Sequence, residues 1–377
     1  MTILEQIKAV NLTDYGVYPE NVAEKLALAK GAAALVVALN NADVDGVALN
    51  LLRTDAEKVY AGMALVAEVL GTERKVLYVP DYASELAATL ADSAKENGVE
   101  LMRGIVNVRA NEKNCVCHIV TMAEVADIAN GCYTEGVYLS VNGGEFKKYH
   151  ADTKLSALLG EDVKGIKTGY VLRDAKALEL SVAQAGIENG VLNAITSNDC
   201  VVDMVQKQLL ACRRQSCGKC VFCREGLLQL EAMQKDITVG KGTLTQLDMT
   251  YEIGEPMTYS TPCSMGQYSS RIATSAVEAF RDEYETHIKK HKCAADVCTA
   301  FRRVYIDPTA CIGCTDCQAS CPTDAIDGGK GYIHVVFDNW CSKCGKCISS
   351  CPENAIHLTT DRVPKLPDRM IRVGRFR

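Results

Sequence analysis

Cysteine is the residue type with which this sequence could do the most chemistry, since the chain of 377 residues carries 19 of them. Most fall in groups separated by only two residues, and two thiolates that close suit a shared metal better than a cross-linked core. The opening residues show neither the basic start nor the apolar run of a secretory signal, so we expect a cytoplasmic protein. The pattern therefore favours metal clusters over disulfides.

Two copies of one cysteine motif lie near the C-terminal end, with Cys311 aligned to Cys341. Each copy reads Cys-x-x-Cys-x-x-Cys-x-x-x-Cys-Pro, the spacing of bacterial ferredoxins that carry two clusters. Three thiolates of one loop can hold three corners of a [4Fe–4S] cube, and the fourth cysteine then reaches the neighbouring cluster. Zinc is a weak alternative for eight ligands at this repeat. The expected ligand sets are Cys311, Cys314, Cys317 and Cys351 for one cluster, and Cys341, Cys344, Cys347 and Cys321 for the other.

A third cysteine motif lies upstream, in Ser-Cys-Gly-Lys-Cys-Val-Phe-Cys-Arg-Glu-Gly at residues 216–226. Its cysteines, Cys217, Cys220 and Cys223, have the same spacing and suit three corners of another cube. The spacing alone also allows zinc. A fourth ligand must come from elsewhere, and Cys263 in Thr-Pro-Cys-Ser-Met-Gly is the natural candidate.

These motifs carry a resemblance to a known family. Residues 216–226, the Pro-Cys-Ser-Met-Gly stretch at 262–266 and Phe-Arg-Asp-Glu-Tyr-Glu-Thr-His-Ile at 280–288 resemble the NADH-binding flavoprotein subunit of respiratory complex I. With the ferredoxin repeat added, the sequence is more similar to the diaphorase-like beta subunit of electron-bifurcating [FeFe]-hydrogenases. The resemblance implies that Cys217, Cys220, Cys223 and Cys263 bind a [4Fe–4S] cluster in a helical bundle, which makes three such clusters in the chain.

Hydrophobic periodicity and this resemblance predict a multidomain chain of α/β and α parts. Residues 59–70 and 85–97 have helical spacing, residues 75–79 indicate a buried strand, and residues 200–290 are largely helical, with one long run over 270–290. We expect a degenerate FMN- and NADH-binding-like α/β domain over 1–132, a small β-grasp domain over 133–182, a helical [4Fe–4S] bundle over 183–292, a two-cluster ferredoxin domain over 293–361 and a basic tail over 362–377.

The flavin and NADH motifs of the family are degenerate in this sequence. The family's glycine-rich loop, whose amides cradle the flavin phosphate, corresponds to residues 30–36, which hold a single glycine. Val44 stands where the family has Glu, and the segment that contacts NADH is missing from the short interval 109–121. We therefore expect no bound FMN, and we expect Asn41, Asp43 and Asp45 to cap or pair locally rather than to bind flavin.

Four further residues could hold zinc, because three thiolates and one imidazole suit a tetrahedral site. We expect this site at the hinge between the bundle and the ferredoxin module. The alternatives are unligated thiols with a solvent-facing His, or His291 as the imidazole in place of His287. The proposed zinc ligands are Cys200, His287, Cys293 and Cys298.

A second group of potential ligands is less well spaced. It comprises Cys115, Cys117, His118 and Cys132, but their spacing along the chain does not supply a convincing fourth ligand. Reduced, unligated thiols are therefore the favoured interpretation.

Charge and hydropathy exclude other classes of function. The net charge of −6, with Lys and Arg spread along the chain, argues against nucleic acid as a partner. No uninterrupted run approaches the roughly 20 apolar residues that span a bilayer. The basic tail contains Pro364 and Pro367, so we expect it to be extended and solvated, with docking onto a partner subunit as the alternative.

The chain is therefore expected to be a multi-cluster electron-transfer subunit of a cytoplasmic oxidoreductase complex. It would relay single electrons between a flavoprotein or catalytic partner and ferredoxin, in a complex that also contains a [2Fe–2S] thioredoxin-like or catalytic subunit. The alternative is an NADH-oxidising FMN subunit with a diverged flavin site. A metal-stabilised scaffold with redox-silent clusters is a third, weaker possibility.

Overall fold

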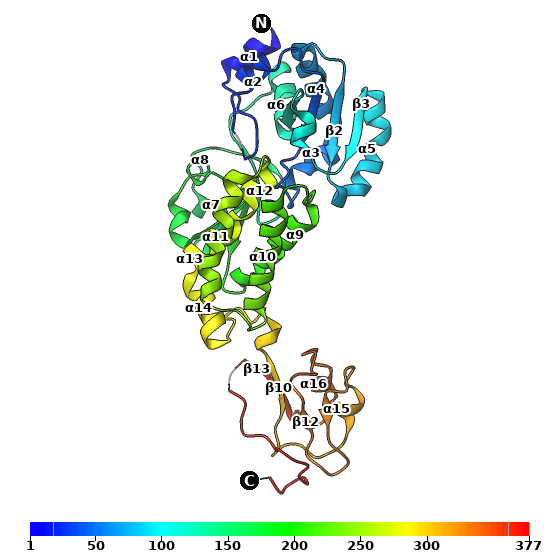
Figure 1. Cartoon of the computed structure of the whole chain (residues 1–377), viewed down its shortest axis with the longest axis vertical. Helices are drawn as coiled ribbons and strands as arrows, with labels where there is room; N and C mark the ends of the chain where they lie inside the picture. The colour runs from blue at the N-terminus through cyan, green and yellow to red at the C-terminus, as the bar shows by residue number, and fades with distance from the viewer. Residues whose placement is uncertain (18, 361, 377) are drawn as a thin grey trace. The chain divides into compact units, whose positions relative to one another are not determined.

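The computed structural model describes residues 1–17, 19–360 and 362–376, and divides the chain into two compact units. The first unit comprises residues 1–234 and 244–281, and the second comprises residues 235–243 and 282–377. Figure 1 colours the chain from its N-terminus to its C-terminus and labels most of its helices and some of its strands.

The first unit begins with a parallel sheet of four strands in the order β3-β2-β1-β4. Alternate residues of β1 and β4 point to one face and pack in the main apolar core with the helices that follow the strands. The strand expected over 75–79 and the helices expected over 59–70 and 85–97 are confirmed. The elements are α1 (Ile3–Ala9), α2 (Val22–Leu28), β1 (Leu35–Ala38), α3 (Asn50–Thr54), α4 (Ala56–Leu70), β2 (Lys75–Val79), α5 (Ser84–Glu96), β3 (Val99–Arg103), β4 (Cys115–His118) and α6 (Ile119–Ala129).

Local capping and one close approach explain how the central helices of this layer are placed. Helix α4 begins where the Asp55 carboxylate accepts a hydrogen bond from the Lys58 amide, and it ends at Gly71 in the left-handed conformation. Gly62 lies against α6 so closely that a Cβ atom there would meet the Met122 carbonyl oxygen. Glycine is therefore required where α4 and α6 pack together.

A mixed sheet of five strands follows, in the order β6-β5-β9-β7-β8. The strand β9 lies in its middle, parallel to β5 and antiparallel to β7. This sheet therefore extends beyond residue 182, where we expected the small β domain to end, because its central strand comes last in the sequence. The elements are β5 (Val137–Val141), β6 (Lys147–Tyr149), α7 (Leu155–Leu159), β7 (Gly165–Thr168), β8 (Val171–Asp174), α8 (Val182–Ala185) and β9 (Val191–Ile195).

The helical region expected over 200–290 is present, but the long run over 270–290 is two helices. Phe280 leaves the helical conformation, while its amide still closes the preceding helix on the Ala276 carbonyl. The helices are α9 (Val201–Gln215), α10 (Val221–Thr238), α11 (Thr245–Ser260), α12 (Ser264–Ser269), α13 (Arg271–Ala279) and α14 (Arg281–Lys290).

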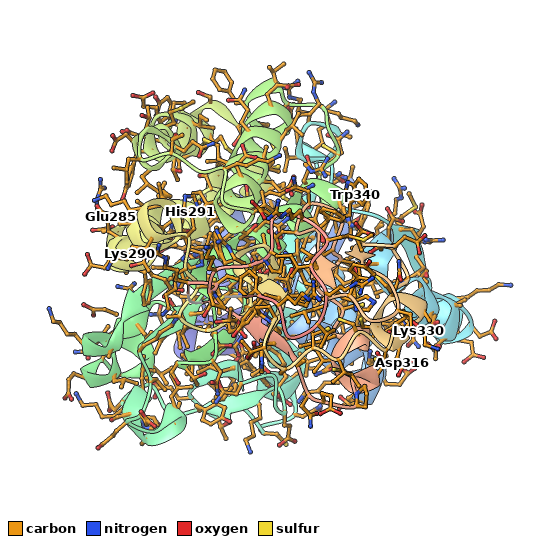
Figure 2. The ribbon with its side chains drawn as sticks, turned by 90° about the horizontal axis from the view of Figure 1, so that it is seen from below. Glu285, Lys290, His291, Asp316, Lys330 and Trp340 are labelled. Carbon is orange, nitrogen blue, oxygen red and sulfur yellow. The ribbon has the colours of Figure 1, made fainter. Side chains whose placement is uncertain are left out.

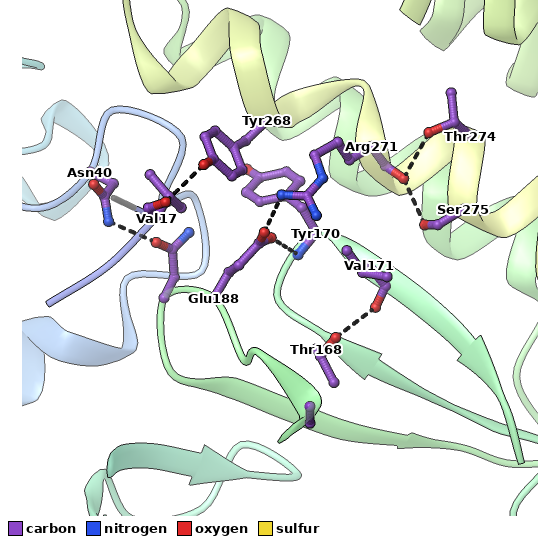
Figure 3. Close-up of polar contacts among 12 residues, drawn as sticks. Val17, Asn40, Thr168, Tyr170, Val171, Glu188, Tyr268, Arg271, Thr274 and Ser275 are labelled. Atoms are coloured by element: carbon purple, nitrogen blue, oxygen red, sulfur yellow. Dashed lines mark hydrogen bonds and ion pairs between the residues drawn. The ribbon is translucent and has the colours of Figure 1, made fainter. Parts of the chain in front are cut away.

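Polar contacts join the two sheets of the first unit to its helices, as Figure 3 shows. Glu188 forms an ion pair with Arg271 of α13 and accepts a hydrogen bond from the Tyr170 amide at 3.2 Å. Tyr268 of α12 donates its hydroxyl to the Val17 carbonyl at 2.8 Å. The parallel sheet, the mixed sheet and the helices α9, α11, α12 and α13 therefore belong to the same compact unit.

The ferredoxin-like part of the second unit consists of two short antiparallel pairs, β10 with β13 and β11 with β12. The tail, expected to be solvated, packs on it instead: the Ile333 amide donates to the Ile371 carbonyl, and the Val373 amide donates to the Gly331 carbonyl. Arg377, the last residue of the expected tail, lies outside the described residues. The elements are β10 (Arg303–Ile306), α15 (Asp316–Ala319), β11 (Ile326–Asp327), β12 (Val335–Val336), α16 (Lys346–Ser350) and β13 (Ile356–Thr359).

Candidate iron–sulfur centres and metal site

The four cysteines of the bundle motif meet at the start of α10 and α12. Cys217 and Cys220 precede α10, Cys223 lies in its first turn, and Cys263 immediately precedes α12. Cys217, Cys220 and Cys263 line one cavity of about 100 Å³, closed by Pro262. Two short segments far apart in the sequence thus present their thiols to one space.

The electrostatics of this thiol group fit a cationic iron centre. Burial, with smaller contributions from the neighbouring Cys263, Cys220 and Cys217, raises the pKa of Cys223 to about 11. A thiolate in such surroundings needs positive charge nearby, which iron supplies. The Gly218 backbone is left-handed and its amide donates to the Ser216 hydroxyl, which shapes the loop between the first two cysteines.

In the second unit, the fourth cysteine of one ferredoxin motif lies with three cysteines of the other. Their side chains line one small cavity together with Pro322, Val304 and Ile326. Backbone amides point at two of these sulfurs: Ala325 donates to Cys321 and Lys343 donates to Cys341, at 3.3 and 3.4 Å. The residues so grouped are Cys321, Cys341, Cys344 and Cys347.

Three of the remaining ferredoxin cysteines lie near one another. Burial, with smaller contributions from the neighbouring Cys311 and Cys314 thiols, raises the pKa of Cys317 to about 12. The Sγ atom of Cys351 accepts a hydrogen bond from the Ala355 amide at 3.3 Å, which matches the amide contact of Cys321 in the other repeat. The group of Cys321, Cys341, Cys344 and Cys347 offers four thiols with amide donors, the donor set that suits a [4Fe–4S] cluster.

Three of the four expected zinc ligands lie together within the second unit. The ligand atoms of His287, Cys293 and Cys298 are all within 4.8 Å of one another, and all three side chains are buried. His287 Nε2 lies 3.6 Å from Cys298 Sγ, while Nδ1 contacts the Glu283 carbonyl at 2.8 Å. A ring whose Nδ1–H is held by a carbonyl presents Nε2 as a ligand, as metal-bound histidines do.

Cys200 and His291 are the other residues of the zinc hypothesis. Cys200 is buried in the first unit, immediately before α9. His291, the alternative imidazole, lies exposed just beyond the end of α14 and is labelled in Figure 2. Burial and the contact with Cys298 therefore favour His287 over His291.

The backbone amides at positions 31–33, in the segment that corresponds to the family's glycine-rich flavin loop, are engaged within the protein. The Gly31, Ala32 and Ala33 amides donate to the carbonyls of Leu70, Ala29 and Lys113. A phosphate site of this kind requires free backbone amides that converge on the anion. The residues present do not fit a flavin phosphate at this segment.

The acidic segment that follows β1 pairs within the protein. Asn41 exchanges two hydrogen bonds with the Val106 backbone, at 2.8 and 2.9 Å. Asp43 accepts a hydrogen bond from the Gly46 amide at 2.7 Å. Asp45 lies 3.3 Å from the Lys167 ammonium. These side chains cap or pair locally.

A cavity that the sequence did not indicate lies at the carboxyl ends of β1 and β4. It has a volume of about 380 Å³, and its lining includes Lys25, Asn40, His118 and Cys263. The chain reverses its direction of strand addition between β1 and β4, and ligands of open parallel sheets bind at such switch points. Only the strand order could have indicated this cavity, because its lining residues come from distant parts of the chain.

The second group of potential ligands is not assembled. Cys115 and Cys117 are buried with their sulfurs 3.8 Å apart, and His118 Nδ1 accepts a hydrogen bond from the Val120 amide. Cys132 is exposed beyond the end of α6. Within the described ranges, these four residues do not form a compact ligand group.

Comparisons with known proteins agree with this arrangement. Residues 203–287 match the model of the NADH-ubiquinone oxidoreductase-F iron-sulfur binding region, and residues 304–358 match that of a 4Fe-4S dicluster domain. The NADP-reducing hydrogenase subunit HndC of Solidesulfovibrio fructosivorans is 34% identical over 155 residues, which is 41% of this chain and 32% of that protein. The F subunit of NADH-quinone oxidoreductase in Streptomyces coelicolor is 33% identical over 105 residues, 28% of this chain and 23% of that protein.

The chain spans about a third of the length of the curated relatives it matches. A crystal structure of the NAD+-reducing [NiFe]-hydrogenase in its H2-reduced state has a similar fold, with a TM-score of 0.66 at 17% identity. The similarity covers 77% of this chain and 63% of that one. Among the residues described here, no helix has both the length and the apolar character needed to cross a membrane. The chain is thus similar to NADH-quinone oxidoreductase F subunits over its F-type iron–sulfur binding region, and it also contains a region similar to a 4Fe-4S dicluster domain.

Proposed function

We propose that this chain is an iron–sulfur electron-transfer subunit of a cytoplasmic, electron-bifurcating oxidoreductase complex. It relays single electrons between a flavoprotein or catalytic partner and ferredoxin, and it carries no hydride chemistry of its own. In this proposal the parallel sheet is a degenerate flavoprotein domain and the mixed sheet is a β-grasp domain. The single observation that carries the proposal is the contrast between the grouped thiols of the bundle and ferredoxin motifs and the amides at positions 31–33, which are engaged within the protein where the family has its flavin loop.

The proposed ligand sets are the four bundle cysteines and the two interleaved ferredoxin sets. When bound, the clusters supply one-electron carriers. The residues of the chain hold the thiolates, exclude water and direct amide donors at sulfur, as Ala325 and Ala355 do. Such hydrogen bonds and burial are the means by which a protein sets the potential of a cluster.

A partner surface on the ferredoxin module supports the relay. Trp340, which directly precedes Cys341, is 65% exposed and lies 5.4 Å from the partly exposed Phe337 ring. Figure 2 labels Trp340 among the side chains of the chain. Exposed aromatic rings beside a redox centre are typical of a surface that another protein covers. We propose ferredoxin or another subunit of the complex as that partner.

The cluster content tests this proposal directly. Anaerobically purified protein should contain about twelve iron atoms, from three four-iron clusters. Replacing Cys217 by Ser should remove one cluster and leave the magnetically coupled pair seen by electron paramagnetic resonance. Replacing the exposed Cys132 by Ser is the matched control and should change neither measurement. About eight irons in well-folded wild-type protein would contradict the bundle cluster.

The alternative function, an NADH-oxidising FMN subunit, is favoured by the cavity at the ends of β1 and β4, because Cys263 also lines it. The test is reconstitution with FMN, followed by extraction of bound flavin and assay of NADH-dependent dye reduction. We expect neither stoichiometric flavin nor dye reduction, because no preorganised anion site offsets the desolvation of the phosphate. Stoichiometric bound flavin together with NADH-dependent dye reduction would establish the alternative.

We also propose one structural zinc, held by His287, Cys293, Cys298 and, as the fourth ligand, Cys200. The compact, buried group of the first three residues and the orientation of the His287 ring support it. Two further features favour a ligand role for Cys200: its thiol is buried, and it belongs to none of the cluster sets. Zinc binding to thiolates is coupled to folding, so loss of a ligand should loosen the surrounding chain.

Elemental analysis tests the zinc site. The Cys298→Ser variant should lose zinc and become more sensitive to proteases around residues 290–305, while Cys132→Ser should retain both zinc and resistance. The iron content of both variants should stay at the wild-type value. Equal zinc and equal cleavage in Cys298→Ser and wild type would show that these residues are ordinary thiols.

A further inference from the structure

The internal repeat gives each ferredoxin cluster its own matched surroundings. The repeat that aligns Cys311 with Cys341 also aligns Val304 with His334. Val304 and His334 are both buried, at 4% and 1% exposure. The two halves of the module therefore place an apolar side chain and an imidazole at equivalent positions.

Each of these residues lies beside the first cysteine of one motif. Val304 lines the small cavity that contains Cys341. His334 contacts the other set, with its Nδ1 atom 3.8 Å from the Sγ atom of Cys311, a hydrogen-bonding distance for the large sulfur atom. The cluster held by Cys311 can thus receive a hydrogen bond from the His334 side chain. At the equivalent position, the cluster held by Cys341 has the apolar side chain of Val304.

The strand pairing shows how the ring is accommodated. Val304 pairs with Leu358 across β10 and β13. In the other half, the register of β11 and β12 continues to Gly328 opposite His334, and a Cβ atom at Gly328 would overlap the imidazole ring. Glycine replaces a leucine where the ring needs the space.

The polar surroundings determine which ring nitrogen carries the hydrogen. The His334 ring is buried at 1% exposure, and burial favours the neutral imidazole, which has a single N–H. Its Nε2 atom is buried and has no hydrogen-bond partner in the part of the chain that the structure describes. Nδ1–H facing the sulfur is therefore the favourable tautomer, because a lone pair on Nδ1 would face a thiolate.

We propose that His334 is a positioning residue for the potential of the cluster held by Cys311. Its Nδ1–H donates to Cys311 Sγ and stabilises the reduced cluster, which carries one more negative charge, relative to the oxidised cluster. The step is a one-electron reduction with no proton transfer. This inference rests on the proposed cluster ligation.

The other donors near the sulfurs do not reproduce this contact. The amides of Ala355 and Ala325 make equivalent hydrogen bonds in the two halves. The second set also has the Lys343 amide at Cys341, and the Thr323 hydroxyl 3.8 Å from Cys321. His334 is therefore expected to change the reduction potential of the cluster held by Cys311.

The test is a redox titration of the intact, full-length chain followed by electron paramagnetic resonance. His334→Val copies the residue of the other half. It should lower the potential of one ferredoxin cluster so that its reduced-to-oxidised ratio falls about tenfold at a fixed applied potential, which is about 59 mV for a one-electron couple. The potential of the other cluster should stay the same. His334→Gln, which keeps an N–H donor, should restore part of the shift.

Two further measurements keep the inference separate from the ligation it rests on. Iron content and cluster signals report the ligation, and the potential reports His334. Gly328→Ala displaces the ring without removing it and should shift the same cluster in the same direction. If His334→Val loses a cluster, the reduction potentials of Gly328→Ala and His334→Gln test the role of His334 instead. Unchanged potentials in variants that retain both clusters would overturn the proposal.

Discussion

Asp43 makes the stability of the first unit depend on pH. Its carboxyl is fully buried, its Oδ1 accepts the Gly46 amide at 2.7 Å, and its Oδ2 is buried without a hydrogen-bond partner among the described residues. Burial, with a smaller contribution from nearby Asp45, raises its pKa from 3.8 to about 7 against the opposing effects of the Gly46 amide and Lys167. The folded chain therefore holds a proton on Asp43 at pH values where the unfolded chain has lost it.

The sign and size of the effect follow from these two pKa values. Between pH 3.8 and about 7 the folded state binds more protons than the unfolded state, so stability is greatest below this range and falls as the pH rises through it. The separation of the two pKa values corresponds to a loss of about 4 kcal/mol at pH 8. Asp43→Asn keeps the acceptor for Gly46 and removes the ionisation, so it should recover most of that loss at pH 8 and little at pH 4.

Anaerobic urea unfolding at several pH values between 4 and 8 measures the effect. The stability of Asp43→Asn should exceed that of wild type by an amount that grows with pH. Asp45→Asn is the control and should destabilise at pH 8, because it leaves the buried Lys167 ammonium without the carboxylate 3.3 Å away. Parallel pH profiles for wild type and Asp43→Asn would refute the reasoning.

Two further predictions concern the packing of each unit. Ending the chain at Met370 removes the backbone hydrogen bonds of Ile371 and Val373. The absorbance of the ferredoxin clusters should therefore bleach faster in air than in the full chain, while the bundle cluster should be unaffected. Equal bleaching rates would show that the tail does not protect the module. Glu188→Gln removes the ion pair with Arg271 and should lower the free energy of unfolding of the first unit by about 1–3 kcal/mol. Urea denaturation measures this change. An unchanged urea midpoint would show that the ion pair contributes no net stability.

Features set by local spacing could be predicted from the sequence. The cysteine motifs are of this kind, because one short loop supplies three ligands of a cube, and the structure places Cys321 with the second motif as the interleaved pattern requires. Helix α5 and strand β2 also follow from local apolar periodicity.

Features that depend on distant pairing could not be predicted in this way. The central strand β9 of the mixed sheet comes after residue 182, so the expected domain boundary fell inside the sheet. The tail has the composition of a solvated segment, yet Ile371 pairs with Ile333 because an edge of the module is available there. The contact of His334 with Cys311 required the register of β11 and β12, which no periodicity reveals.

Residues 30–36 and the interval 109–121 are joined directly by backbone hydrogen bonds. The Ala33 amide donates to the Lys113 carbonyl, and the Cys115 amide donates to the Ala34 carbonyl. Glycines introduced at positions 32–34 would free the backbone conformation but leave these amides engaged. We therefore expect Ala32→Gly, Ala33→Gly and Ala34→Gly together to leave FMN binding undetectable by equilibrium dialysis. Flavin binding by that triple variant would show that side chains, and not occupied amides, keep the phosphate out.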